Sequence, residues 1–171
     1  IEAGLDVGRY DQALETLKRL DQATLSAAET LEEFIEMIDA DKKYLTIGIQ
    51  EVYGEIPSDL PIFPLDQVCE ILNELSEFHE LALVSKGKPE QQLFKLKSAG
   101  IDSTIFSKIK LSEEDDKKPH YKMVLDELGF APKQTLVCGD RVKRDLVPAK
   151  ELGCVTVQMQ WGRGLSEATK S

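Results

Sequence analysis

The chain has 171 residues and a formal net charge of −10, from 31 acidic and 21 basic side chains. Its length allows one full domain, or a core with a small inserted subdomain. The acidic balance argues against non-specific nucleic-acid binding, which requires a basic surface. No stretch of the sequence is long and apolar enough to predict a membrane-spanning helix.

The three cysteines, Cys69, Cys138 and Cys154, lie far apart, each within an apolar run. Their number is odd, and their spacing matches no metal-binding motif. Buried free thiols are therefore expected, in a reducing compartment such as the cytoplasm.

Residues 1 to about 55 are expected to be helical, with no strand among them. Apolar side chains recur at helical spacing from Ala13 to Leu20 and again from Leu31 to Ile38. Ser26 precedes Glu29 by three residues, the spacing of a capping box at the start of the second helix. A third helix is predicted over residues 40–53.

A passage rich in proline follows, over residues 54–64, and is expected to link two parts of the chain. We predict a helical subdomain over residues 1–60 and an α/β core over residues 61–171. In the core, helices are predicted over 68–75, 89–99, 119–128 and 147–152, and strands over 81–84, 104–109, 135–138 and 154–159, with a loose tail over 161–171. This alternation predicts an α/β fold with a doubly wound parallel sheet.

The most informative stretch follows the strand predicted over 135–138. Gly139 allows a sharp bend and a close approach of a ligand, and Asp140 lies just beyond the strand end, where open α/β sheets place their chemistry. Asp145 follows five residues later. Two carboxylates on one loop make a site for a hard cation such as Mg²⁺. The alternative is that Asp140 is a turn residue and Asp145 a helix N-cap; for Asp140 we favour the metal, and for Asp145 both interpretations stay open.

Two other strand ends or helix starts carry polar groups. Ser85, Lys86 and Gly87 follow the strand predicted over 81–84, where a hydroxyl and backbone N–H groups can bind an anion. Lys118 precedes Pro119, which disfavours a helical conformation for the preceding residue, so Lys118 is expected just outside the helix and free to project along the sheet edge. Each signal alone is weak, because polar turns and solvated charge runs are common.

The ordered set of Ser85, Lys118 with Pro119, Gly139-Asp140 and Asp145 resembles the second, third and fourth motifs of the haloacid dehalogenase-like hydrolase superfamily. The resemblance covers residues 65 to 160, and the helical part before Pro57 is similar to the cap that many members carry. It implies a Rossmann-like core with an N-terminal helical cap. Lys118 is favoured over Lys117 because only Lys118 has the neighbouring proline.

The superfamily's first motif is absent from its expected place. That motif is an apolar strand ending in Asp-x-Asp, whose first aspartate is the nucleophile, and the strand is central in the sheet of the family. We therefore expect it upstream of this chain. Without it, the strands at 81–84 and 135–138 would face each other across a gap, and the chain is expected to be inactive and either marginally stable or a homo-oligomer paired through that gap.

The resemblance implies a Mg²⁺-dependent phosphatase that acts on a small phosphomonoester through an aspartyl-phosphate. In it, Asp140 and Asp145 would hold Mg²⁺, Ser85 and Lys118 would be catalytic, and the phosphate would be bound by Ser85, Lys86, Gly87 and Lys118. The alternatives are a metal-free haloacid dehalogenase, against which Asp140 argues, a non-catalytic binding or regulatory module of the same fold, and a receiver-like or flavodoxin-like domain. Neither nucleic acid nor membrane is expected as a partner.

Overall fold

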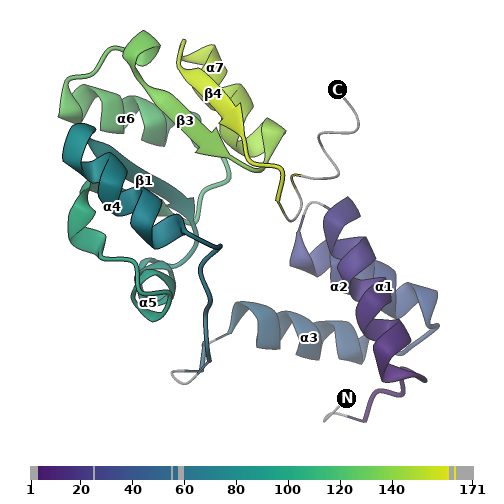
Figure 1. Ribbon diagram of the computed structural model, residues 1–171. Helices are drawn as coiled ribbons and strands as arrows, with labels where there is room; N and C mark the ends of the chain where they lie inside the picture. The colour runs from purple at the N-terminus through teal and green to yellow at the C-terminus, as the bar shows by residue number, and fades with distance from the viewer. Residues whose placement is uncertain (1–3, 25, 55, 58–59, 162–163, 165–171) are drawn as a thin grey trace. The chain divides into compact units, whose positions relative to one another are not determined.

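The structure is a computed structural model that describes residues 4–24, 26–54, 56–57, 60–161 and 164. It divides into two compact units, one made of Ile1–Glu55 with Gln158–Ser171 and the other of Ile56–Val157 (Figure 1). The predicted division into residues 1–60 and 61–171 stays a prediction. Most of the tail predicted to be loose lies outside the described residues. No helix in the described part of the chain is long and apolar enough to cross a bilayer.

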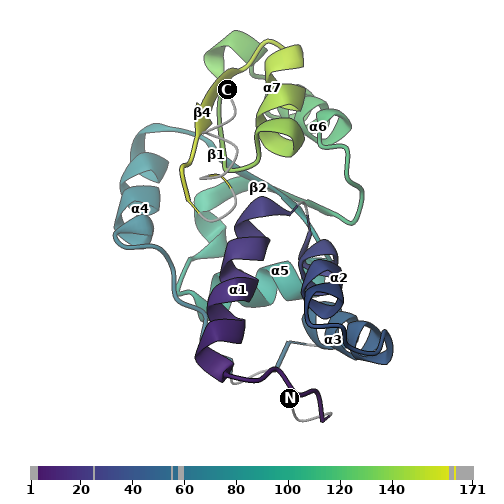
Figure 2. The ribbon, with the colours of Figure 1, turned by 90° about the vertical axis from the view of Figure 1, so that its right-hand side faces the viewer.

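The first unit contains three helices, α1 (Tyr10–Ala23), α2 (Ala27–Met37) and α3 (Lys43–Tyr53), and α2 contacts both of the others (Figure 2). Its buried centre is formed by apolar side chains of α1 and α2, namely Ala13, Leu20 and Phe34. The predicted N-cap is confirmed, because the Ser26 hydroxyl accepts a hydrogen bond from the Glu29 N–H at 3.2 Å. Such a cap satisfies one of the unpaired donors at the start of α2.

The second unit alternates helices and strands as predicted. Its elements are α4 (Val68–Phe78), β1 (Leu81–Lys86), α5 (Pro89–Ser98), η1 (Ser103–Ile105), β2 (Phe106–Ser112), α6 (Lys118–Leu128), η2 (Pro132–Gln134), β3 (Leu136–Gly139), η3 (Val142–Leu146), α7 (Val147–Glu151) and β4 (Val155–Gln158). The strand predicted over 104–109 starts later, because Asp102 caps the short helix η1 by accepting the Thr104 N–H at 2.8 Å.

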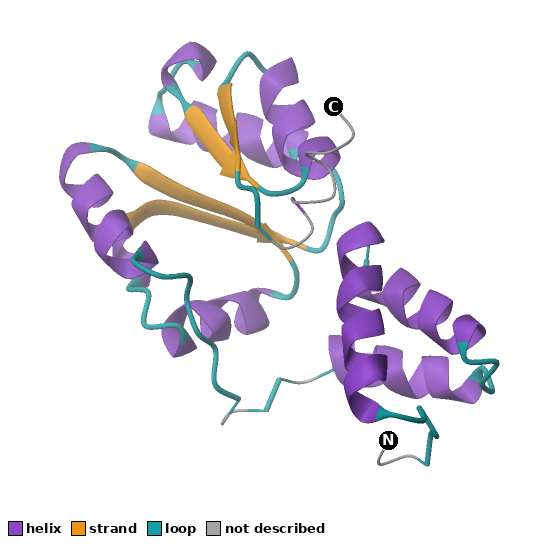
Figure 3. Cartoon of the chain, turned by 45° about the vertical axis from the view of Figure 1, so that its right-hand side comes forward, coloured by secondary structure: helices purple, strands orange, loops and turns teal. Residues whose placement is uncertain are grey.

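The strands form two pairs, β1 with β2 and β3 with β4. The first pair is parallel, with Leu83 opposite Ile109 and Ser85 opposite Leu111, and the arrows of β3 and β4 also point the same way (Figure 3). The predicted α/β class with parallel strands is confirmed. Among the described residues no strand hydrogen bonds join the two pairs, so each pair keeps an edge without a strand partner.

The core of this unit lies where α6 and α7 cover the strands. Tyr121, Leu125, Ala149 and Cys154 are buried, and Val84 of β1 and Val137 of β3 pack against them from the two pairs. No residue of β1, β2, β3 or β4 is itself fully buried. In a doubly wound sheet, helices normally cover both faces, and every strand except the two outermost has a partner strand on each side. The sheet of the described residues is therefore incompletely covered.

All three cysteines are free thiols, as predicted, but their burial differs. Cys154 is buried, Cys69 is half-buried and Cys138 is exposed. The predicted burial of Cys138 is wrong because β3 alternates exposed and half-buried positions, and Cys138 points to the exposed side. Apolar character alone did not show that this side of β3 is open.

Candidate active site

At the end of β3, Gly139 packs directly against the side chain of Asp145. A Cβ at position 139 would lie 2.5 Å from the Cβ of Asp145 and 2.8 Å from its Oδ2. Real Cβ atoms do not approach other atoms so closely, so a side chain at position 139 would displace the carboxylate. The absence of a side chain at Gly139 therefore allows the close approach of the Asp145 side chain, where the sequence analysis expected a ligand.

Asp145 is buried and holds two donors. Its Oδ2 accepts the backbone N–H of Arg141 at 3.1 Å, and its Oδ1 accepts Lys117 Nζ at 2.7 Å. The Lys117 and Asp145 side chains are 17% and 9% exposed, which makes this a largely buried ion pair. Asp145 lies inside η3 and is not its N-cap, so the capping interpretation is wrong.

The structure brings Lys117, not Lys118, to this position. Lys118 is the first residue of α6, with Lys117 as the cap, so the prediction that Lys118 lies outside the helix is wrong. The carboxylate of Asp116 accepts the Lys118 N–H at 2.9 Å and so satisfies a donor of the first turn. From there the Lys118 side chain reaches Glu151 at 2.8 Å, in an exposed ion pair.

Lys117 also connects the two strand pairs. Its Nζ donates to the backbone carbonyl of Val84, at 3.4 Å, while it is paired with Asp145. Val84 directly precedes Ser85 in β1, and Asp145 packs on Gly139 at the end of β3. The C-terminal ends of β1 and β3 therefore meet at one ammonium group. This places Ser85 and Asp145 on the same edge of the sheet.

At the end of β1 the three predicted anion-binding residues are already partly engaged. The Ser85 hydroxyl donates to Oε1 of Gln92, in α5, at 3.4 Å. Gly87 has a φ of +139°, a conformation that favours glycine, and its N–H donates to the Ser112 carbonyl at 2.9 Å. Lys86 Nζ pairs with Asp115 at 2.6 Å. The Ser85 oxygen can thus still accept a hydrogen bond, and its hydroxyl donates only a weak hydrogen bond to Gln92, which a ligand oxygen could replace.

Asp140 is half-buried and sits in an environment that disfavours its charge. Burial raises the pKa of its carboxyl, and the neighbouring charge of Asp145 raises it further, against smaller opposing effects of its own backbone N–H, Arg141 and Lys117. A bound cation would relieve both effects.

Asp140 and Asp145 are the two carboxylates that follow β3 at this edge. No group of three or more His, Cys, Asp or Glu side chains within the described ranges is arranged to hold a metal ion. This small donor set fits Mg²⁺, which commonly uses one or two carboxylates and completes its coordination with water and substrate phosphate. Both oxygens of Asp145 already accept hydrogen bonds, so Asp140 is the more available ligand.

The sequence contains one Asp-x-Asp, at Asp39-Ala40-Asp41, which our prediction did not consider. It lies between α2 and α3 in the helical unit, not at a strand end. Asp39 has a positive φ of 51°, and Asp41 accepts the Lys43 N–H at 2.8 Å. These are the roles of turn and cap residues, so this pair does not supply the first motif.

Ser85, Lys117, Asp140 and Asp145 thus lie at or after strand ends of an α/β unit with parallel strands, which is the arrangement that the sequence resemblance implied, with Lys117 in place of Lys118. A model of the haloacid dehalogenase-like hydrolase family matches residues 14–159. The chain belongs to the haloacid dehalogenase-like hydrolase family.

Known relatives agree with this membership. The chain is 28% identical over 172 residues to a glyceraldehyde 3-phosphate phosphatase of Methanocaldococcus jannaschii, covering 95% of this chain and 73% of that protein. Among solved structures, it is similar to a hydrolase of the family from Bacillus subtilis that was determined with magnesium, with a TM-score of 0.60, 18% identity and coverage of 93% and 76% of the two chains. It is also similar to a family enzyme from Bacteroides thetaiotaomicron determined with magnesium and inorganic phosphate, with a TM-score of 0.50, 20% identity and coverage of 88% and 86%. At these identities the structural likeness shows the fold alone, and the predicted fold class is confirmed.

Proposed function

We propose that this protein is a Mg²⁺-dependent phosphatase that acts on a small phosphomonoester. The observation that carries the proposal is the meeting of Lys117, Asp145 and the ends of β1 and β3 beside Asp140. Family membership and the phosphatase among the relatives support the reaction class. The magnesium in two solved relatives supports the choice of metal.

Each residue has a distinct task in this proposal. Asp140 holds Mg²⁺, and Asp145 adds negative charge beside it while it fixes Lys117 through their ion pair. The metal offsets charge on the phosphoryl group. Ser85 turns its hydroxyl from Gln92 to a phosphoryl oxygen, and Lys86 and Gly87 line the same turn. Lys117 supplies the positive charge that the sequence assigned to Lys118.

The nucleophile is proposed to come from a segment upstream of this chain that enters between β1 and β3. Two features support this. Both strand pairs keep an edge without a strand partner in the described part of the chain, and the strand residues are incompletely buried. An aspartate at the end of such a strand would lie beside Lys117, within the reach that phosphoryl transfer requires. The helical unit would serve as the cap that excludes water. The proposed location of the protein is the cytoplasm.

The test compares the 171-residue chain with a protein extended upstream through an Asp-x-Asp strand. Phosphate release from phosphomonoesters is measured over a Mg²⁺ titration, with the mass in solution recorded for both. We expect the extended protein to be active, its Asp140→Asn variant to lose Mg²⁺-dependent turnover while it stays folded, and the short chain to be silent. Normal turnover of Asp140→Asn at saturating Mg²⁺ would refute the metal assignment, and full activity of a monomeric short chain would refute the upstream nucleophile.

The second candidate is a binding or regulatory module that keeps the fold without catalysis. It is favoured by one observation, the lack of an Asp-x-Asp at any strand end of this sequence. The same comparison separates the two functions. An extended protein that binds Mg²⁺ by calorimetry but releases no phosphate from any ester would support the module.

A further inference from the structure

Beside the proposed site, two cations from different strand pairs share one carboxylate. Oδ1 of Asp115 lies 2.6 Å from Lys86 Nζ and 3.7 Å from the guanidinium of Arg144. Lys86 is the last residue of β1, Arg144 is in η3 after β3, and Asp115 is in the loop between β2 and α6. The three side chains therefore converge on the edge that carries Ser85 and Asp145.

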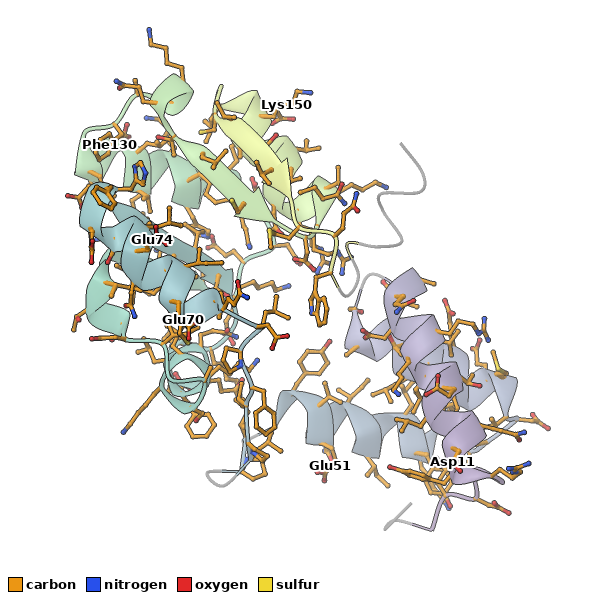
Figure 4. The ribbon with its side chains drawn as sticks, in the orientation of Figure 1. Asp11, Glu51, Glu70, Glu74, Phe130 and Lys150 are labelled. Atoms are coloured by element: carbon orange, nitrogen blue, oxygen red, sulfur yellow. The ribbon has the colours of Figure 1, made fainter. Side chains whose placement is uncertain are left out.

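This arrangement is positively charged in a strongly acidic protein. The chain has a net charge of −10, and acidic residues such as Glu70 and Glu74 lie together on the outer side of α4 (Figure 4). At the sheet edge, by contrast, Lys86 and Arg144 offer two cations to a single exposed carboxylate. Within this group of three side chains, one negative charge faces two positive ones, so the two cations can accept a further anionic oxygen.

The carboxylate of Asp115 is held only weakly in its place. Its side chain is 67% exposed, and those of Lys86 and Arg144 are 41% and 38% exposed. Exposed ion pairs contribute little to stability, so breaking this one costs little. Hydrogen bonding and charge from Lys86, with a smaller effect of Arg144, lower the pKa of Asp115, so its carboxylate stays ionised as an internal anion.

We infer that Lys86 and Arg144 bind a second anionic group of the substrate, such as a carboxylate. When no substrate is bound, the Asp115 carboxylate occupies the position of that group. The inference rests on the proposed function, because the phosphoryl group would occupy the neighbouring Ser85–Asp140 site. A substrate with an anionic group at its other end exchanges that group for the Asp115 carboxylate. The guanidinium of Arg144 and the ammonium of Lys86 match a carboxylate in geometry and charge. The substrate class is then a small phosphomonoester that also carries a carboxylate or a second phosphate.

The experiment measures binding without turnover, so that it does not depend on catalysis. Isothermal titration calorimetry with Mg²⁺ omitted compares 3-phosphoglycerate with glycerol 3-phosphate, which has a hydroxymethyl group in place of the carboxylate. We expect 3-phosphoglycerate to bind about tenfold more tightly, as one charge-assisted contact would produce. Arg144→Gln should reduce this preference severalfold and leave the affinity for glycerol 3-phosphate unchanged. Lys86→Gln should also reduce the preference, but it should weaken glycerol 3-phosphate as well, because Lys86 adjoins the Ser85 turn of the proposed phosphoryl site.

The direction of the affinity change in Asp115→Asn distinguishes the two explanations. The substitution removes the internal competitor, so it should tighten the binding of 3-phosphoglycerate, whereas a merely structural ion network would bind less tightly or equally after this change. Lys122→Gln is the control, since Lys122 forms an exposed pair with Asp126, at 2.7 Å, within α6. Equal affinity for the two ligands, no binding of either, or unchanged or weaker binding of 3-phosphoglycerate by Asp115→Asn would overturn the inference. Ser85→Ala should weaken both ligands equally; if it has no effect while the carboxylate preference persists, the proposed phosphoryl site fails and the anion site stands.

Discussion

Replacing Lys117 by methionine should destabilise the α/β unit far more than the same change at Lys118. Lys117 and Asp145 form an ion pair with side chains 17% and 9% exposed, and loss of the ammonium leaves a buried carboxylate with one remaining donor, the Arg141 N–H. Breaking a buried pair from one side costs about 3 kcal/mol. Lys118 and Glu151 are 44% and 54% exposed, so Lys118→Met should cost less than about 1 kcal/mol.

Urea unfolding followed by far-UV circular dichroism measures both variants, with the slope checked so that only the midpoint changes. The double variant Lys117→Met with Asp145→Asn should recover part of the loss, because the uncompensated carboxylate is gone. Methionine keeps most of the lysine stem, so packing changes little. In the extended protein, Lys117→Met should also abolish turnover while Lys118→Met retains it.

A larger loss of stability or activity at Lys118 than at Lys117 would refute the assignment. It would mean that the lysine beside proline occupies the site in solution, as the family motif implies. An unchanged midpoint for both variants would instead show that the pair with Asp145 contributes nothing, and the argument from burial would be wrong.

Three further predictions follow from single contacts. Gly139→Ala should lower the free energy of unfolding by about 1–3 kcal/mol, measured by urea unfolding, because the new Cβ would lie 2.5 Å from that of Asp145; a neutral effect would contradict the close approach. Iodoacetamide should modify exposed Cys138 before buried Cys154, and because burial raises the pKa of the Cys154 thiol, less of it is thiolate at about pH 8 and its delay should shorten as the pH rises; peptide mass spectrometry that finds Cys154 modified first would contradict this. Ser26→Ala should cost about 1 kcal/mol of stability of the helical unit, followed by circular dichroism, since its hydroxyl accepts the Glu29 N–H; no loss would show that the cap is dispensable.

Much of the fold could be predicted because the signals are local. Apolar spacing gave the first two N-terminal helices, and Ser26 placed the start of α2 correctly. The alternation of short apolar strands with helices gave the α/β class, which depends only on the order of elements. The start of β2 was missed because Asp102 caps η1, a side-chain bond that competes with the strand.

The site was less predictable because it depends on long-range contacts. Proline after Lys118 favoured that lysine, yet its partner is Glu151, 33 positions along the chain, while Lys117 finds Asp145 at 28 positions. Neighbouring lysines have nearly the same local signal, and only the direction of the first helical turn separates them. From the sequence, Asp145 was equally suited to a helix N-cap and to a metal site. Its burial beside Gly139 follows from its position inside η3, which the sequence did not predict.

Lys117 shows why the charge at this site and the arrangement of its strands belong together. Its ammonium is shared between a carboxylate at the end of β3 and a carbonyl of β1, although no strand hydrogen bonds join those two strands in the described residues. A carbonyl at 3.4 Å is a weak partner for a charged donor. The ammonium would exchange it readily for an anionic oxygen that entered between the strands. A carboxylate on an inserted strand and a phosphoryl oxygen beside Ser85 are the two groups that the proposed reaction would bring beside Lys117.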